Sequence, residues 1–168
     1  IGLKSISYTD NRTSAYNGES DYETFYMPTL FIVSPDYNGF RAGLSLDAPA
    51  GLSKKWSQSF PKTFAQEFSL EVLEINPSAS YKINEMFSVA VGVRAIYADA
   101  TVKSSGMISQ DYGGVTASRD MDGNTWECGY NLAATFRPMD NINLALTYRS
   151  KVDLELDGDA NLATSASF

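Results

Sequence analysis

The stretch NINLALTYRSKVDLELD, residues 141 to 157, alternates between apolar and polar side chains along its whole length. Counting every second residue from Ile142, seven of eight are apolar, and seven of the eight interleaved residues are polar. Successive side chains of a strand point to opposite faces, so the pattern predicts one continuous strand. Such a strand would extend roughly 50 Å, against about 17–20 Å for strands of globular proteins. This length favours a transmembrane β-strand that continues past the bilayer.

The composition excludes several classes of protein. The 168 residues carry a net charge of −7 without a basic run, which argues against a nucleic-acid partner. The single cysteine, Cys128, cannot form an internal disulfide, and the absence of histidine removes Ser-His and Cys-His catalysis and His-ligated metal sites. The acidic stretch 120–124 has its glycine at the wrong position for a calcium loop and predicts a turn instead. We therefore expect no enzyme, no metal and no cofactor.

Further strands follow from the same alternation and from clusters of aromatic and β-branched residues. Short turns at 36–38, 84–86 and 138–141 alternate with long polar segments around 10–20, 50–66 and 103–124, a pattern typical of bacterial outer-membrane barrels. A change of phase between Val72 and Leu73 predicts a β-bulge in that strand. The additional strands are expected at the start of 1–13 and at 21–34, 39–48, 68–83, 87–102 and 126–137.

Aromatic residues recur at a spacing that suits a membrane. Phe87 and Tyr97 lie ten residues apart, and so do Trp126 and Phe136 in the next strand. Ten residues of a strand tilted by about 40° rise about 25 Å, the height of the apolar band between two aromatic girdles. Phe87 and Phe136 lie beside short turns, so these two residues are expected at the periplasmic girdle. Tyr97 and Trp126 are expected at the opposite girdle.

These patterns predict an all-β fold, an antiparallel transmembrane β-barrel, with residues 1–168 as one partial barrel domain. Seven strands cannot close a bacterial barrel, and unpaired strand edges are not tolerated in lipid. The chain also begins without an initiator methionine or a signal peptide. Either partner chains or further sequence must complete the barrel, and we expect further sequence.

Three segments resemble the FadL-type outer-membrane transporters of long-chain fatty acids and other hydrophobic compounds. They are MPTLFIVSP (27–35), INPSASYKINEMFSVAVGVRAIYADA (75–100) and GNTWECGYNLAATFRPMDNINLALTYRSKVDLELDGD (123–159). The resemblance implies a fourteen-stranded monomeric barrel in the bacterial outer membrane, with an N-terminal hatch in its lumen. This chain would supply strands one to seven, without the hatch and the second half.

The resemblance also implies a lateral opening in the third strand, through which substrate leaves the lumen for the membrane. Independently, a proline and a glycine two residues apart end or bend a strand, so the strand is expected to break at 49–51. An ordinary strand end is the alternative interpretation. The positions that match the family's kink are Asp47, Ala48, Pro49, Ala50, Gly51 and Leu52.

Two further groups of residues are candidates for ligand binding. Arg94, Lys103 and Arg149 are possible partners for a carboxylate; alternatively, charges on the polar face form a network that braces the strands. Loop lysines, including Lys103, could also attract lipopolysaccharide phosphate. The inner face of the fifth strand is unusually apolar, which predicts a hydrophobic substrate pocket or packing against the hatch. Its residues are Ile96, Ala98, Ala100 and Val102.

The favoured function is passive outer-membrane transport of long-chain fatty acids or other hydrophobic compounds. The partners expected are this ligand, outer-membrane lipid and lipopolysaccharide. A soluble β-sandwich or lipocalin-like module that binds a hydrophobic ligand is the alternative, but it does not explain the strand lengths. An outer-membrane enzyme or adhesin is a third interpretation.

Overall fold

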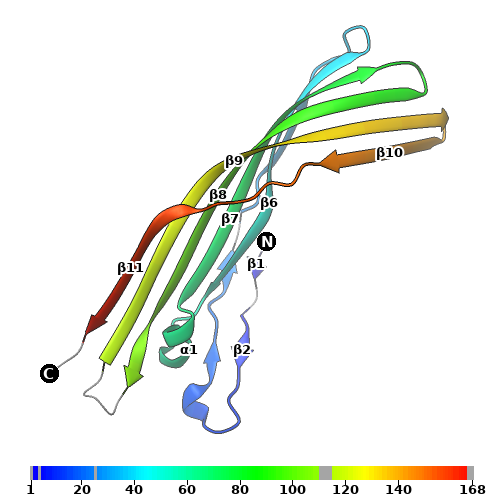
Figure 1. Ribbon diagram of the computed structural model, residues 1–168. Coiled ribbons are helices and arrows are strands. Elements are labelled where there is room, and N and C mark those ends of the chain that lie inside the picture. The colour runs from blue at the N-terminus through cyan, green and yellow to red at the C-terminus, as the bar shows by residue number, and fades with distance from the viewer. Residues whose placement is uncertain (1, 4, 25, 110–114, 166–168) are drawn as a thin grey trace.

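One long antiparallel sheet dominates the computed structural model, which describes residues 2–3, 5–24, 26–109 and 115–165 (Figure 1). The strand order is β10-β9-β8-β7-β6-β5, and β11 pairs with β9 beyond the end of β10. Each strand from β5 to β10 therefore lies beside its neighbour in the chain. The strands are β5 (Thr29–Val33), β6 (Phe40–Lys55), β7 (Glu67–Lys82), β8 (Phe87–Ser109), β9 (Val115–Met139), β10 (Ile142–Arg149) and β11 (Asp157–Ser165).

The central strands are longer than a bilayer crossing requires. β6 and β7 have 16 residues each, β8 has 23 and β9 has 25. A tilted membrane-crossing strand needs about 9–11 residues, so these strands continue beyond the hydrocarbon region. The strands from β5 to β11 form one extended sheet rather than two packed layers, which does not fit the sandwich alternative.

Short turns connect the strands at one end of the sheet, called here the short-turn end. Between β5 and β6, Asn38 and Gly39 have φ values of 52° and 83°, and Tyr37 and Phe40 exchange both backbone hydrogen bonds. This is the hairpin geometry that an Asn-Gly pair favours. Between β7 and β8, Asn84 Oδ1 accepts hydrogen bonds from two backbone N–H groups. The predicted short turns are confirmed.

Small elements gather at the opposite end, called here the helix end because it contains α1 (Ser59–Phe64) (Figure 1). The ring of Tyr16 stacks on Phe60 of α1 with 4.3 Å between centroids, which joins the N-terminal segment to this helix. Within the described ranges, no helix is long and apolar enough to cross a bilayer. The remaining small elements are β1 (Gly2–Leu3), β2 (Ser7–Tyr8), η1 (Ser14–Tyr16), β3 (Gly18–Glu19) and β4 (Glu23–Thr24), with β1 paired to β4 and β2 to β3.

The predicted aromatic spacing forms two cross-strand pairs. Phe87 lies directly opposite Phe136 in the β8–β9 register, and Tyr97 lies opposite Trp126. Their ring centroids are 4.6 Å and 5.1 Å apart. Because these four side chains share one face, Glu74 and Arg94 point to the other face, called here the inner face.

The strand predicted over 141–157 is interrupted. β10 ends at Arg149, opposite Asn131, and β11 begins at Asp157, opposite Asn124. Seven residues, 150 to 156, therefore stand opposite six residues of β9, 125 to 130. The prediction of one continuous strand was wrong because the alternation persists through a segment, called here the 150–156 crossing, that leaves the ladder with β9.

The prediction of a polar loop over 103–123 was also wrong for most of that segment. Residues 103–109 belong to β8 and pair with β9 in a register from Lys103 opposite Asp120 to Ser109 opposite Val115. The only large apolar residues over 103–109 are adjacent, Met107 and Ile108, so no hydrophobic alternation marks this segment. Residues 110–114 lie outside the described part of the chain.

The β-bulge predicted between Val72 and Leu73 lies on the neighbouring strand. β7 keeps one unbroken register with β8 across this level, whereas β6 shifts between Asp47, opposite Glu74, and Ala50, opposite Val72. The change of phase in β7 instead marks a switch in which face is apolar. The strand predicted to end at Ala48 continues through this shift to Lys55. The strand predicted over 21–34 is divided into the two residues of β4 and the five residues of β5.

Candidate functional site

The centre of the inner face is a network of charges around Glu74. This side chain is 1% exposed, and Arg94 donates to it twice, from Nε to Oε1 at 3.1 Å and from Nη2 to Oε2 at 2.8 Å. Arg149 of β10 also donates to Glu74 Oε1. Arg94 Nη1 donates to the carbonyl oxygen of Ser150 at 3.2 Å. One carboxylate therefore ties β7, β8 and β10 together and anchors the start of the 150–156 crossing.

The three predicted carboxylate partners do not form one site. Arg94 and Arg149 meet on Glu74, as the alternative of a bracing network describes. Lys103 lies toward the helix end and forms an ion pair with Asp120, with 3.4 Å between Nζ and Oδ2. The two arginines are occupied by an internal acid, so binding a ligand carboxylate there requires competition with Glu74.

Beside this network, the inner face becomes apolar. Val72, Ile96 and Ala98 form a buried cluster with 7%, 4% and 0% exposure. Leu70 and Val152 pack against it. Two predicted pocket residues, Ile96 and Ala98, thus belong to a contiguous apolar surface.

The other two predicted pocket residues lie farther toward the helix end. Ala100 and Val102 line a separate hollow of about 190 Å³. Leu156 and β11 form part of its wall. The alternating pattern found all four apolar residues on one face but could not separate the cluster from this hollow.

Val152 is a part of the site that the sequence did not reveal. Its alternation with Tyr148 placed it on the outer face, whereas the crossing carries it onto the apolar cluster. Gly129 makes room for this, since a Cβ there would lie 2.7 Å from Val152 Cγ2 and 2.8 Å from Ser150 Oγ. A glycine amid the bulky residues of this strand was the available signal of a close approach.

The register shift in β6 lies beside a cavity of about 400 Å³. Among the described residues, β5 pairs with β6 only as far as Thr29 opposite Asp47. Val72 of the inner cluster lines this cavity, as do Leu73 and Tyr97, which alternate to the outer face. The cavity therefore has residues of both faces of the sheet in its wall. Its other lining residues are Tyr26, Met27, Pro28, Ala48, Ala50, Gly51 and Glu71.

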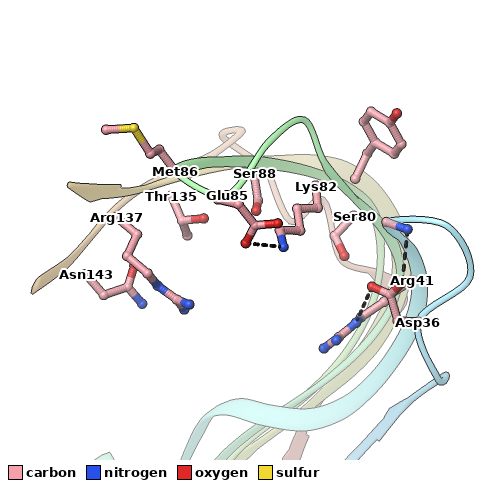
Figure 2. Close-up of a pocket in the computed structure, with 12 residues that line it drawn as sticks. Asp36, Arg41, Ser80, Lys82, Glu85, Met86, Ser88, Thr135, Arg137 and Asn143 are labelled. Atoms are coloured by element: carbon pink, nitrogen blue, oxygen red, sulfur yellow. Dashed lines mark hydrogen bonds and ion pairs between the residues drawn. The ribbon is translucent and has the colours of Figure 1, made fainter. Parts of the chain in front are cut away.

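Two more cavities lie near the ends of the sheet. An apolar one of about 490 Å³ at the helix end is lined by Ile6, Tyr8, Trp56, Phe60 and Phe64, with Ser7, Pro61 and Ala65. A polar one of about 270 Å³ lies at the short-turn end, where Figure 2 shows Arg41, Arg137 and Asn143 pointing to the concave side of the sheet. Across the described residues, no cluster of acidic, histidine or cysteine side chains could hold a metal ion.

Long antiparallel strands with aromatic pairs on one face and a polar network on the other define part of the wall of a transmembrane β-barrel. A family model described as outer membrane protein transport protein (OMPP1/FadL/TodX) matches residues 3–168. The chain belongs to this family and is located in the bacterial outer membrane.

Several characterised proteins resemble the chain. It is 24% identical over 173 residues to the long-chain fatty acid transport protein of Salmonella typhi, covering 92% of this chain and 39% of that protein. It is 24% identical over 157 residues to outer membrane protein P1 of Haemophilus influenzae, covering 77% of this chain and 34% of that protein. The chain thus spans between about a third and two fifths of the length of these relatives.

A solved structure supports the same fold. The crystal structure of a Pseudomonas aeruginosa FadL homologue matches with a TM-score of 0.75 at 23% identity, covering 90% of this chain and 36% of the other. The predicted family, fold class and location are confirmed.

Proposed function

We propose that the protein containing this chain passively transports long-chain fatty acids or other hydrophobic compounds across the outer membrane. The names of the relatives support this substrate class. The observation that carries the proposal is the apolar cluster of Val72, Ile96 and Ala98 on the inner face, beside the charged network around Glu74. Lumens that pass ions and water are lined by polar side chains, whereas a hydrophobic tail requires apolar contact.

The apolar cavity at the helix end is the proposed place of first contact. Its aromatic side chains are partly exposed, including Phe64 at 68%, so a ligand can reach them without a rearrangement of the sheet. Burial of apolar surface there supplies a driving force of about 25 cal/mol per Å². The ligand then moves to the apolar cluster of Val72, Ile96 and Ala98. We assign no residue a catalytic role.

The proposed exit is a lateral opening at Asp47–Leu52. The shift of the β6–β7 register, the short reach of β5 along β6 and the cavity with residues of both faces support this position. Irregular backbone at membrane depth is tolerated where it lines a cavity. A ligand that leaves here would enter the bilayer without crossing the charged network around Glu74.

Uptake of oleate by cells that make the full-length protein tests the inner cluster. The double variant Val72→Thr and Ile96→Thr is expected to lower oleate affinity and initial uptake by about tenfold, because two apolar groups become polar. The matched control, Val91→Thr with Val93→Thr, changes the outer face of β8 and should leave uptake within twofold. Unchanged uptake by the cluster variant, at an equal outer-membrane level, would refute the proposal.

A second variant tests the exit separately. Ala48→Trp places a large side chain in the cavity beside the register shift, and it is expected to slow oleate uptake while oleate binding persists. Ala42→Trp, which lies on the same strand and is exposed, is the control. Equal uptake by the two variants would contradict a lateral exit at this position.

A further inference from the structure

The polar cavity at the short-turn end has no part in the proposed path, and its walls are unusually rich in cations for this chain. Arg41, Lys82 and Arg137 line it together with Asp36 and Glu85, so the cavity carries a formal charge of +1 in a protein of net charge −7 (Figure 2). A positive concavity in an acidic protein raises the local concentration of anions.

Two ion pairs within the cavity neutralise part of its positive charge. Arg41 Nε lies 3.3 Å from Asp36 Oδ2, and Lys82 Nζ lies 2.7 Å from Glu85 Oε2. These contacts neutralise both carboxylates that face the cavity. Arg41 still presents both Nη groups, since only its Nε has a partner within the described residues.

Arg137 is the cation left over. Within the described ranges, its guanidinium makes no hydrogen bond or close ion pair. The hydrogen bond from Lys82 lowers the pKa of the Glu85 carboxyl, and the charge of Arg137 adds to this effect only at longer range. Figure 2 shows its side chain on the concave side, next to Asn143. A planar guanidinium in this position presents paired donors that match a carboxylate or phosphate.

Hydroxyl groups complete the cavity between the cations. Ser88 of β8 lies opposite both Lys82 of β7 and Thr135 of β9, so three adjacent strands present polar groups in one row. Ser80 lies opposite Arg41 in the next row. In the described part of the chain, the side chains of Ser80, Ser88, Thr135 and Asn143 form no hydrogen bonds with one another or with other groups, which leaves them free to donate to a ligand.

We propose that this cavity binds a small oxyanion, a carboxylate or phosphate group, held by Arg41 and Arg137 with hydroxyl donors from Ser80, Ser88 and Thr135. The volume of about 270 Å³ lies below the usual 300–1,000 Å³ of pockets for drug-sized ligands, so the site fits a head group rather than an acyl chain. Its position at the end opposite the apolar cavity makes it independent of the proposed transport path.

Ligand-observed NMR titrations of the full-length protein in non-ionic detergent test the site with acetate, inorganic phosphate and octanoate. Saturable binding of acetate and phosphate is expected. R137Q should weaken it at least about fivefold, because a charge-assisted pair of hydrogen bonds is lost. Thr135→Val, which keeps the shape and removes the hydroxyl, should weaken it about twofold to fivefold.

R119Q is the matched control, since Arg119 is an exposed arginine at the other end of β9 and its removal changes the net charge equally. Equal affinities for acetate and octanoate in the binding that R137Q weakens would support a free small anion as the ligand. Much tighter octanoate binding that R137Q also weakens would overturn that part of the proposal. Absence of saturable binding, or equal weakening by R137Q and R119Q, would overturn the site itself. Neither result depends on whether the protein transports fatty acids.

Discussion

The Glu74 carboxylate and the Arg94 guanidinium form a doubly hydrogen-bonded ion pair across β7 and β8, with distances of 3.1 Å and 2.8 Å. Both side chains are nearly excluded from solvent, at 1% and 10% side-chain exposure. Arg149 reaches the same carboxylate from β10. The inner face is therefore braced at one acidic residue, whose loss affects three strands at once.

Replacing Glu74 with glutamine is expected to lower the free energy of unfolding by about 3 kcal/mol, because it leaves Arg94 buried without a counter-charge. Urea unfolding of the full-length protein in detergent micelles measures this change. The control is Asp153→Asn, which breaks the exposed pair with Lys151 at 2.6 Å and should cost less than about 1 kcal/mol. Equal losses in the two variants would show that the burial of the pair has no energetic consequence.

Replacing Gly129 with alanine is expected to displace the 150–156 crossing, because the new Cβ would meet Val152 Cγ2 at 2.7 Å. Overpacking of this kind costs about 1–3 kcal/mol in the free energy of unfolding. Adding Val152→Ala should restore part of the loss. Gly51→Ala is the control, since nothing lies within 4 Å of a Cβ at that position. Strictly additive effects of the changes at 129 and 152 would contradict the contact.

The stacked rings of Phe87 and Phe136 should be energetically coupled. A double-mutant cycle with Phe87→Ala and Phe136→Ala is expected to give a coupling energy of about 0.5–1.5 kcal/mol, the range for aromatic pairs at this separation. Thermal unfolding of the four proteins in one detergent provides the measurement. A cycle between Phe87 and Trp126, which lie at different levels of the sheet, should give no coupling.

The turn between β5 and β6 is expected to depend on pH. The hydrogen bond from the Gly39 N–H, together with Arg41, lowers the pKa of Asp36 below its ordinary value of 3.8. Since the folded pKa is depressed, the contribution to stability is complete above the ordinary value and is lost as pH falls through the folded one. Amide exchange at Gly39 should accelerate below about pH 4 relative to neighbouring amides, after correction for intrinsic rates. Asp36→Asn should abolish this dependence, and its persistence in that variant would contradict the assignment.

Sequence patterns predicted the parts of the fold that are governed by the membrane. Phe87, Tyr97, Trp126 and Phe136 fall on one face at two levels because lipid demands an apolar, aromatic-bounded surface. Residues 103–109 of β8 and 115–125 of β9 were missed, since both segments are mostly polar or small and no periodic signal remains. α1 was missed because its six residues, with Pro61 among them, are too few to show a helical period.

Sequence patterns could not predict the features that depend on contacts between residues distant in the chain. Val152 continues the alternation of β10, yet it contacts a cluster from β7 and β8. The partner of Arg94 depends on the β7–β8 register, which places Glu74 opposite Ile96 and within reach of the guanidinium. The irregularity near Val72 was visible in β7 but belongs to β6, because a pattern in one strand does not show which neighbour carries the additional residue.

The extra residue in the 150–156 crossing means that chain length, together with the space left by Gly129, determines the shape of this part of the wall. Deleting one residue from the crossing would bring the registers of β10 and β11 into agreement and allow them to merge into a single strand. Val152 would then lose its place on the apolar cluster. A one-codon deletion would thus remodel the interior by taking Val152 off the apolar cluster.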